Sequence, residues 1–323
     1  MTKEIKTYNQ AIQALRLAVN TFSAEPEQAK EIKEIVQNSY GCLGQMLYNR
    51  AFLNWGLRDR NIEQEYKAQN FTFSLLCPYQ DINAQLLLYF LIRPLFKTKF
   101  FNKRLLEIGC GNGIGLKMTA QLLQTKYALG VDLVQTLVSN AQRNFYAKEH
   151  VNYLQADAEL LPLQDESFDI ITNLESSHLY PRVDHFFSEV VRILTPGGFF
   201  CYADVYTDAK KQAMQLDQFV ASRKNLCILQ KKNITKMVQA SIYNRLIANE
   251  KKFYNMARSI FGDENPFFLN ELSYLARAMG ISFLPWWKVW MRNPDLRPIA
   301  KAARKSEYWG GTKLYYYYLI QKR

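Results

Sequence analysis

The chain has 323 residues, 48% of them hydrophobic, which is enough apolar material to bury one enlarged domain or two small ones. Five scattered cysteines without a C-x-x-C pair argue against a disulfide framework or a zinc site. A polar N-terminus and a short, interrupted apolar run at 82–96 argue against a signal peptide or a membrane span, so we expect a cytoplasmic protein. The net charge of +12 is unevenly distributed, because residues 1–204 carry a net −1 and residues 205–323 a net +13. A basic region of this kind suits binding to nucleic acid, anionic lipid or an acidic partner, or is simply a solvated surface.

Helical patterns come first in the chain. Residues 4–22 and 26–49 are predicted helices, and the apolar run at 82–96 is typical of a buried one. An apolar strand at 104–108 then enters a loop with glycine at positions 109, 111, 113 and 115, and helical spacing resumes at 116–123. Glycine lets the backbone turn sharply and approach a ligand, and a helix N-terminus adds a positive dipole end. This loop is typical of a nucleotide-type pocket at the carboxyl end of a parallel strand.

The following elements alternate between strand and helix. The predicted strands are 127–132, 151–155, 168–173 and 199–203, and the predicted helices are 134–148 and 183–194, the latter ended by a turn at 195–198. This alternation indicates parallel βαβ units in a doubly wound α/β sheet. A basic, mostly helical segment then interrupts it and is interpreted as a cap inserted after strand five. A helix at 268–279, a strand-like 281–284 and a β-prone 313–320 are expected to complete seven strands, the last one antiparallel.

Polar residues follow several of these strands, at the edge of the sheet where ligands bind. Asp132 ends the second strand, where a dinucleotide fold places an acid for ribose hydroxyls, although such an acid can also cap the next helix. Asp157 follows the third strand and could accept a hydrogen bond from an adenine amino group or cap a helix. Asn173 follows the fourth strand. We therefore expect one ligand site at this edge.

The spacing of the glycines distinguishes between nucleotide ligands. Neither Gly109 nor Gly111 starts a G-x-G-x-x-G, so the NAD fingerprint fails. Glu107 to Gly113 reads E-x-G-x-G-x-G, which resembles motif I of class I S-adenosylmethionine (SAM) methyltransferases. Further segments resemble the same superfamily, and within it the small-molecule O-methyltransferases of the phthiotriol methyltransferase type: 157–169, 173–181, 189–198 and 202–204. Residues 48–56 and 233–238 also resemble that group, but the basic insert is longer than its pattern.

The resemblance implies SAM as cofactor, a Rossmann-like core and no metal. It divides the chain into a helical lid with the helices leading into the core (1–100), a SAM-binding core (101–205), a helical substrate cap (206–266) and residues that complete the sheet (267–323). The implied cofactor-binding residues are Glu107, Gly109, Cys110, Gly111, Gly113, Asp132, Leu133, Asp157, Ala158, Asn173 and Leu174. The implied substrate or lid residues are Tyr48, Trp55, Glu175 and Tyr180, although aromatic residues in such places also simply pack helices onto cores.

A methyl acceptor must be held in line with the sulfonium, and a hydroxyl acceptor also needs a base. Of the three histidines, His150 and His185 are expected at the surface, whereas His178 follows the fourth strand. The resemblance makes His178 the general base and Asp204, at the end of strand five, its orienting partner. The alternative is a loop histidine that bonds only backbone. We expect methylation of a hydroxyl on a largely apolar small molecule of phenolic, polyketide or lipid type.

Other functions stay open at this point. Methylation of carbon on a quinone or lipid would use the same cofactor half. An RNA or protein methyltransferase would explain the basic C-terminal third, but Asn-Leu-Glu-Ser at 173–176 departs from the Asn/Asp-Pro-Pro-aromatic motif typical of base-amine enzymes. Nucleic acid is therefore not the expected partner, whereas peripheral contact with an anionic membrane stays open. A SAM-binding regulator without turnover is disfavoured by the intact His178 and Asp204.

Overall fold

The computed structural model describes residues 23–47, 52–71, 81–206, 209–249 and 313–323, most of 280–301, and residues 251, 254, 255 and 258. The helices predicted at 4–22 and 268–279 lie outside this set.

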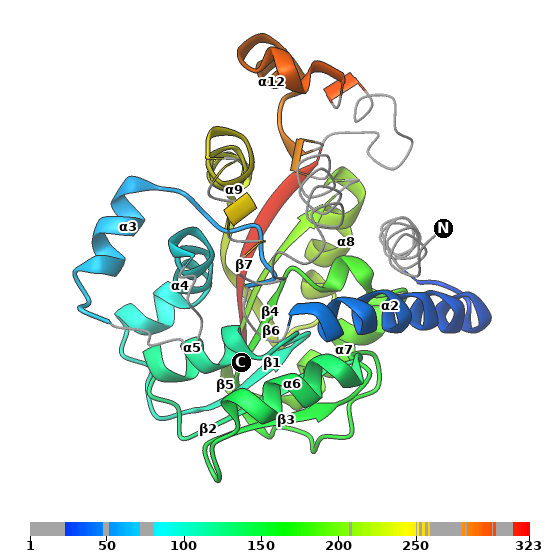
Figure 1. The fold of residues 1–323 in the computed structure, drawn as a ribbon. Helices are drawn as coiled ribbons and strands as arrows, with labels where there is room; N and C mark the ends of the chain where they lie inside the picture. Colours follow the sequence, from blue (N-terminus) through cyan, green and yellow to red (C-terminus); the bar gives the residue numbers. More distant parts are fainter. Residues whose placement is uncertain are drawn as a thin grey trace.

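A seven-stranded sheet forms the centre of the fold, with the strand order β3-β2-β1-β4-β5-β7-β6 (Figure 1). Five strands run parallel: β1 (Arg104–Ile108), β2 (Tyr127–Asp132), β3 (Val151–Gln155), β4 (Phe168–Leu174) and β5 (Leu194–Tyr206). The last strand, β7 (Leu314–Lys322), is inserted antiparallel between β5 and β6 (Leu226–Asn233). The predicted doubly wound α/β class and the antiparallel closing strand are confirmed. The strand order reverses direction between β1 and β4, where such sheets place their ligands.

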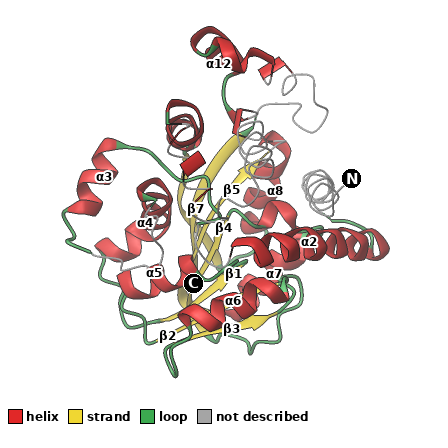
Figure 2. Ribbon diagram, viewed as in Figure 1, coloured by secondary structure: helices red, strands yellow, loops and turns green. Residues whose placement is uncertain are grey.

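Helices cover both faces of the sheet (Figure 2). One face packs against α4 (Ile82–Lys97), α5 (Ile114–Leu122) and α6 (Gln135–Phe145), and the other against α7 (Val183–Ile193) and α8 (Ala209–Ala221). Successive strand side chains point to opposite faces, so Leu105 joins the first cluster and Leu106 the second. Because both faces are buried, the central strands read as continuous apolar runs, which is why their sequence predicted them.

One prediction about the chain order is wrong. The segment 206–266, expected to be mostly helical, also contains the strand β6, which pairs with β7. The strand expected at 281–284 is helical at Ile281 and Phe283. The structure has β6 at the edge of the sheet with one neighbour, so polar residues such as Lys231 and Lys232 are tolerated and blur its strand pattern. The covering helices follow strand six: α9 (Thr235–Ile242), the π-helical η2 (Tyr243–Ala248), α12 (Trp286–Arg292) and η3 (Pro294–Leu296).

A second difference concerns the start of β5. The strand begins at Leu194 rather than at the predicted Phe199, and the pairing with β4 shifts register between Phe168 and Ile170. The predicted turn sequence at 195–198 therefore forms an irregular strand start, with Gly197 at φ +78°.

Two N-terminal helices precede the core. The long α2 (Pro26–Leu47) lies along α6, while α3 (Arg60–Lys67) lies near α4 (Figure 1). The approach of α2 is close because Thr136 donates to the carbonyl of Gly41 at 3.2 Å and Asn140 to that of Gly44 at 2.7 Å. A Cβ on Gly44 would lie 3.0 Å from the Thr136 hydroxyl. Within the described part of the chain, no helix is long and apolar enough to cross a bilayer.

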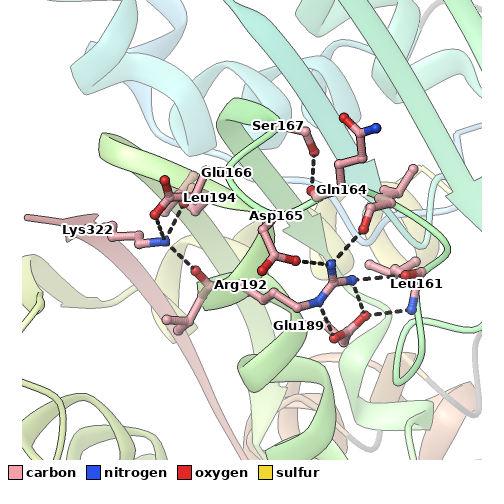
Figure 3. A network of polar contacts seen from close by, with 11 residues as sticks. Leu161, Gln164, Asp165, Glu166, Ser167, Glu189, Arg192, Leu194 and Lys322 are labelled. Atoms are coloured by element: carbon pink, nitrogen blue, oxygen red, sulfur yellow. Dashed lines mark hydrogen bonds and ion pairs between the residues drawn. The ribbon is translucent and has the colours of Figure 1, made fainter.

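A partly buried arginine fixes the loop between β3 and β4 (Figure 3). The guanidinium of Arg192 on α7 donates to the carbonyls of Leu161 and Leu163, at 2.9 and 2.6 Å, and to both oxygens of Glu189. Glu189 in turn accepts the backbone N–H of Leu161 at 2.7 Å. Charge-assisted bonds of this kind are short and strong, so they hold the loop that carries Asp157 in place.

Candidate active site

A cavity opens at the carboxyl ends of β1, β2 and β4, with about 1100 Å³ of empty volume including the open solvent at its mouth. The predicted residues that line it are Glu107, Gly109, Cys110, Gly111, Asp132, Leu133, Asp157, Ala158, Leu174, Glu175 and Tyr180. Predicted residues that do not line it are Gly113, Asn173, Trp55, His178 and Asp204. Tyr48 lies outside the described residues.

The glycine loop needs its glycines for different reasons. Gly109, Gly111 and Gly113 all have positive φ, at +74°, +53° and +82°. A Cβ on Gly109 would lie 2.1 Å from the Ser176 hydroxyl, and one on Gly113 would lie 2.7 Å from the ring of Tyr153. These two glycines allow neighbouring segments to pack. Gly111 faces the cavity, because the nearest atom to its added Cβ is a methyl of Leu53 at 3.3 Å.

Two carboxylates surround this loop. Asp132 accepts the backbone N–H of Gly111 at 2.8 Å and that of Val134 at 2.9 Å, so it orders the loop and the start of α6. Burial raises its pKa, while these backbone bonds oppose the rise. Glu107 is buried, and its Oε2 has no hydrogen-bond partner among the described residues. Burial first, and then the charge of Asp132, raise the pKa of Glu107 to about 8. An unpartnered buried carboxyl at a cavity wall fits a cationic or hydrogen-bond-donating ligand.

The loop after β3 is tied to α2 by ion pairs. Asp157 accepts from the ammonium of Lys33 at 2.6 Å and from the backbone N–H of Glu159 at 3.0 Å. Lys33 also contacts Glu159, which is buried and bonds to Arg182 at 3.1 Å. No helix follows Asp157, so the alternative interpretation as a helix cap is wrong. Lys33 and Glu159 both line the cavity.

Asn173 was expected to follow the fourth strand, but it lies within β4 and its side chain points inward. It is fully buried, and its amide donates to the carbonyl of Ile108 at 2.9 Å, to the Ser176 hydroxyl at 2.9 Å and to the Tyr180 hydroxyl at 3.2 Å. These bonds join the ends of β1 and β4. Ser176 and Tyr180, held in this way, then form part of the cavity wall.

His178 and Asp204 form a buried pair. Their Nδ1 and Oδ1 atoms are 2.8 Å apart, and 12% of the His178 side chain is exposed against 1% for Asp204. Asp204 also accepts from the His178 backbone N–H at 3.0 Å and from the Ser177 hydroxyl at 2.6 Å. Burial lowers the pKa of His178, but the charge and hydrogen bond of Asp204, together with the charge of Glu175, raise it above its usual value overall. His185 and His150 are not part of this cluster.

Glu175 links the N-terminal region to the last strand. It sits at φ +49°, accepts the backbone N–H of Trp55 at 2.8 Å and accepts from the hydroxyl of Tyr315 on β7 at 2.6 Å. Burial raises its pKa to about 7, against the effect of these two bonds. The Trp55 ring does not line the cavity but packs 5.6 Å from the ring of Phe283.

Several residues of the site escape prediction from sequence. The residues concerned are Lys33, Ser177, Tyr202 and Tyr315. Each of them acts through contacts between residues more than twenty positions apart, including the 2.8 Å bond of Ser177 to Tyr202. A lysine on the polar side of a helix and a tyrosine in a β-prone run carry no local sign of these roles. Within the described residues, no group of three or more His, Cys, Asp or Glu side chains could hold a metal ion.

Comparison with known sequences finds a match to a domain family in the core of the chain. A methyltransferase domain family matches residues 106–202. The fatty-acid O-methyltransferase of Mycolicibacterium smegmatis is 42% identical over 106 residues, which is 32% of this chain and 37% of that protein. The phthiotriol/phenolphthiotriol dimycocerosates methyltransferase of Mycobacterium tuberculosis is 37% identical over 115 residues, 36% of this chain and 42% of that protein. The chain therefore spans less than half the length of these curated relatives.

Solved structures share the fold over nearly the whole chain. The [4+2]-cyclase SpnF superposes with a TM-score of 0.57 at 16% identity, covering 94% of this chain and 99% of that one. The geranyl diphosphate C-methyltransferase of Streptomyces coelicolor superposes with a TM-score of 0.52 at 14% identity, covering 93% and 99%. A cyclase and a methyltransferase on one fold show that the fold alone does not decide the reaction.

The cavity fits the cofactor of such a domain. Gly111 leaves its wall open, Glu107 offers an unpartnered carboxyl, and Asp132 and Asp157 present carboxylates in the same cavity. Each carboxylate oxygen has two lone pairs, so the acids retain acceptor capacity beyond their backbone bonds. These features, the strand order of the sheet and the family match identify residues 106–202 as a class I SAM-dependent methyltransferase domain.

Proposed function

We propose that this protein transfers the methyl group of SAM to a hydroxyl oxygen of a largely apolar, lipid-type small molecule. The observation that carries the proposal is the His178–Asp204 pair at the ends of β4 and β5, next to a cavity lined by Glu175, Ser176 and Leu179. SAM supplies an electrophilic methyl group. The residues of this chain must then hold the acceptor in line and take up its proton.

His178 is the proposed general base. Its Nδ1 is occupied by Asp204, which leaves Nε2 as the nitrogen able to accept a proton. Asp204 fixes the ring orientation and stabilises the imidazolium that forms, and the Ser177 hydroxyl and Val205 backbone N–H hold Asp204 at 2.6 and 2.7 Å. The His178 side chain is 12% exposed, so it is not fully sealed from solvent.

The apolar character of the acceptor is supported by the wall and by the relatives. Phe52, Leu53, Leu88 and Leu179 contribute apolar side chains to the cavity. Two relatives matching the core are named for methylation of fatty acids and of phthiotriol dimycocerosates. Those names describe these relatives, and we extend to this chain only the class of an apolar acceptor with an oxygen nucleophile.

The test is methyl transfer from radiolabelled SAM to a panel of long-chain fatty acids, hydroxylated lipids, phenols and bulk RNA. We expect label in a hydroxylated or phenolic lipid, with the product showing a methoxy carbon by NMR. Label in a fatty acid would give a methyl ester and identify a carboxylate acceptor, which would contradict the need for a base. A new carbon–carbon bond, or preference for RNA, would overturn the assignment to oxygen methylation of a small molecule.

A further inference from the structure

One face of helix α12 carries an exposed apolar stripe, and its opposite face is anchored in the core. Trp287, Trp290 and Met291 are exposed by 52%, 36% and 69%. Their spacing of i, i+3 and i+4 places them on one face of the helix. Val289 points the other way and is 1% exposed within the core cluster. An anchored helix with large apolar side chains in solvent is an interaction surface rather than part of the core.

Cations lie on both sides of this stripe. Lys288 and Arg292, one turn apart, are exposed on one flank. On the other flank, Arg297 donates to the carbonyl of Trp290 at 3.1 Å, and its guanidinium lies 5.7 Å from that ring. Lys301 is also exposed, and Asp295 is the one acid among the described residues of 286–301. The surface therefore has an apolar centre with cationic side chains on both sides.

The anchoring is visible in the contacts of the same segment. Leu284, Leu296 and Ala300 are buried in the core cluster with Val289. The side chain of Asn293, at the end of α12, is 3.3 Å from the hydroxyl of Tyr243 on η2. Figure 1 shows α12 as an outlying element beyond the sheet, at the end opposite the loops around β2 and β3. The stripe consequently sits on a protruding and fixed support.

We propose that α12 docks this protein on the surface of an anionic lipid bilayer. Trp side chains favour the membrane interface, where an apolar body meets polar headgroups. Apolar residues beside Lys and Arg on one helix are typical of helices that lie in that interface. A protein partner of standard size would cover about 800 Å² per side, much more than one short helix face offers. RNA would be expected to follow a basic groove, and the apolar stripe at the centre of the cations does not provide one.

Docking would bring the enzyme to the phase in which an apolar acceptor is concentrated. The inference does not depend on the proposed reaction, because binding to a bilayer is measured without turnover. Its failure and the failure of the methyl-transfer proposal are thus separate results.

The experiment is co-sedimentation of the full chain with vesicles of phosphatidylcholine alone or with 30% phosphatidylglycerol. We expect binding to the anionic vesicles that weakens with salt, and quenching of tryptophan emission by brominated lipid. The pair K288Q/R292Q should reduce partitioning roughly 30-fold, since each cation near an anionic surface contributes about a fivefold factor. The pair W287S/M291S should reduce both binding and quenching on anionic vesicles.

The matched control is the exposed aromatic and cationic patch at the far end of the molecule, formed by Tyr146, Arg143 and Lys148. The variants Y146S and R143Q/K148Q should bind anionic vesicles like the wild type. Thermal melting of all variants checks that they fold. The proposal would be overturned if the control variants lost as much binding as the α12 variants, or if the protein bound neutral vesicles equally well. It would also be overturned if the protein bound no vesicles at all, or if α12 bound RNA or a protein in preference.

Discussion

Replacing Asp204 by asparagine tests the chemistry of the site most directly. The two oxygens of Asp204 accept four hydrogen bonds, from the Ser177 hydroxyl, the Val205 N–H, and the backbone N–H and ring Nδ1 of His178, at 2.6 to 3.0 Å. In Asp204→Asn one oxygen becomes an NH₂ group, which cannot accept, so two of these donors lose their acceptor. Hydrogen bonds to a buried charge contribute about 1.5–3 kcal/mol each. Two such losses should lower the free energy of unfolding by about 3–6 kcal/mol.

The substitution should also slow catalysis. A misoriented base costs about 10²–10⁴-fold in rate. The pH dependence of the rate should also change, in a direction that the pKa of His178 determines. His178 must be neutral to accept a proton, so the rate rises as pH increases through its pKa, which Asp204 holds above the usual value. Without the carboxylate charge that pKa falls, and the acid limb of the rate profile should move to lower pH. The protonated histidine stabilises the fold below about pH 6.5 and loses this contribution as pH rises through its raised pKa; the variant should lack this dependence.

The assay is single-turnover methyl transfer from pH 5 to 9, with SAM affinity measured by calorimetry. Asp169→Asn is the matched control. Asp169 bonds to the backbone N–H and guanidinium of Arg104 at the amino ends of β4 and β1, whereas the cavity lies at the carboxyl ends. The control substitution should lower stability but leave the position of the acid limb unchanged. If Asp204→Asn keeps the wild-type rate and pH profile, positioning alone supports the reaction and His178 is structural.

Three further perturbations address the cofactor side of the site. Gly109→Ala should weaken SAM binding at least tenfold, because its Cβ would lie 2.1 Å from Ser176 at a φ of +74°; unchanged calorimetric affinity would mean that the loop is misassigned. SAM affinity should rise with pH by up to about tenfold per unit from pH 6 towards the Glu107 pKa near 8, because the carboxylate forms over this range. Glu107→Gln should flatten this slope. A slope that persists in the variant would exclude Glu107 as its source. Lys33→Met should weaken SAM binding by releasing Asp157 and α2, whereas the exposed control Lys30→Met should not; equal effects would show that the ion pair holds nothing at the cavity.

The sequence alone determined the parallel half of the sheet and the place of the cavity. Apolar runs such as 127–132 and 168–173 become β2 and β4 because a strand buried on both faces must be apolar along its length. The glycine loop was predictable because positive φ and close approach are local demands that few other residues meet. These features depend on neighbours in the chain, and a single sequence records them.

Tertiary structure decided what depends on distant partners. The edge strand β6 was missed because one-sided pairing tolerates its lysines, and its place is set by β7, far along the chain. Asn173 lies within β4 rather than after it, and its side chain donates to the carbonyl of Ile108. Glu175 accepts hydrogen bonds from Trp55 and Tyr315, which come from distant parts of the chain. A hydrogen bond between such residues leaves no local pattern, because its geometry exists only after the sheet has assembled.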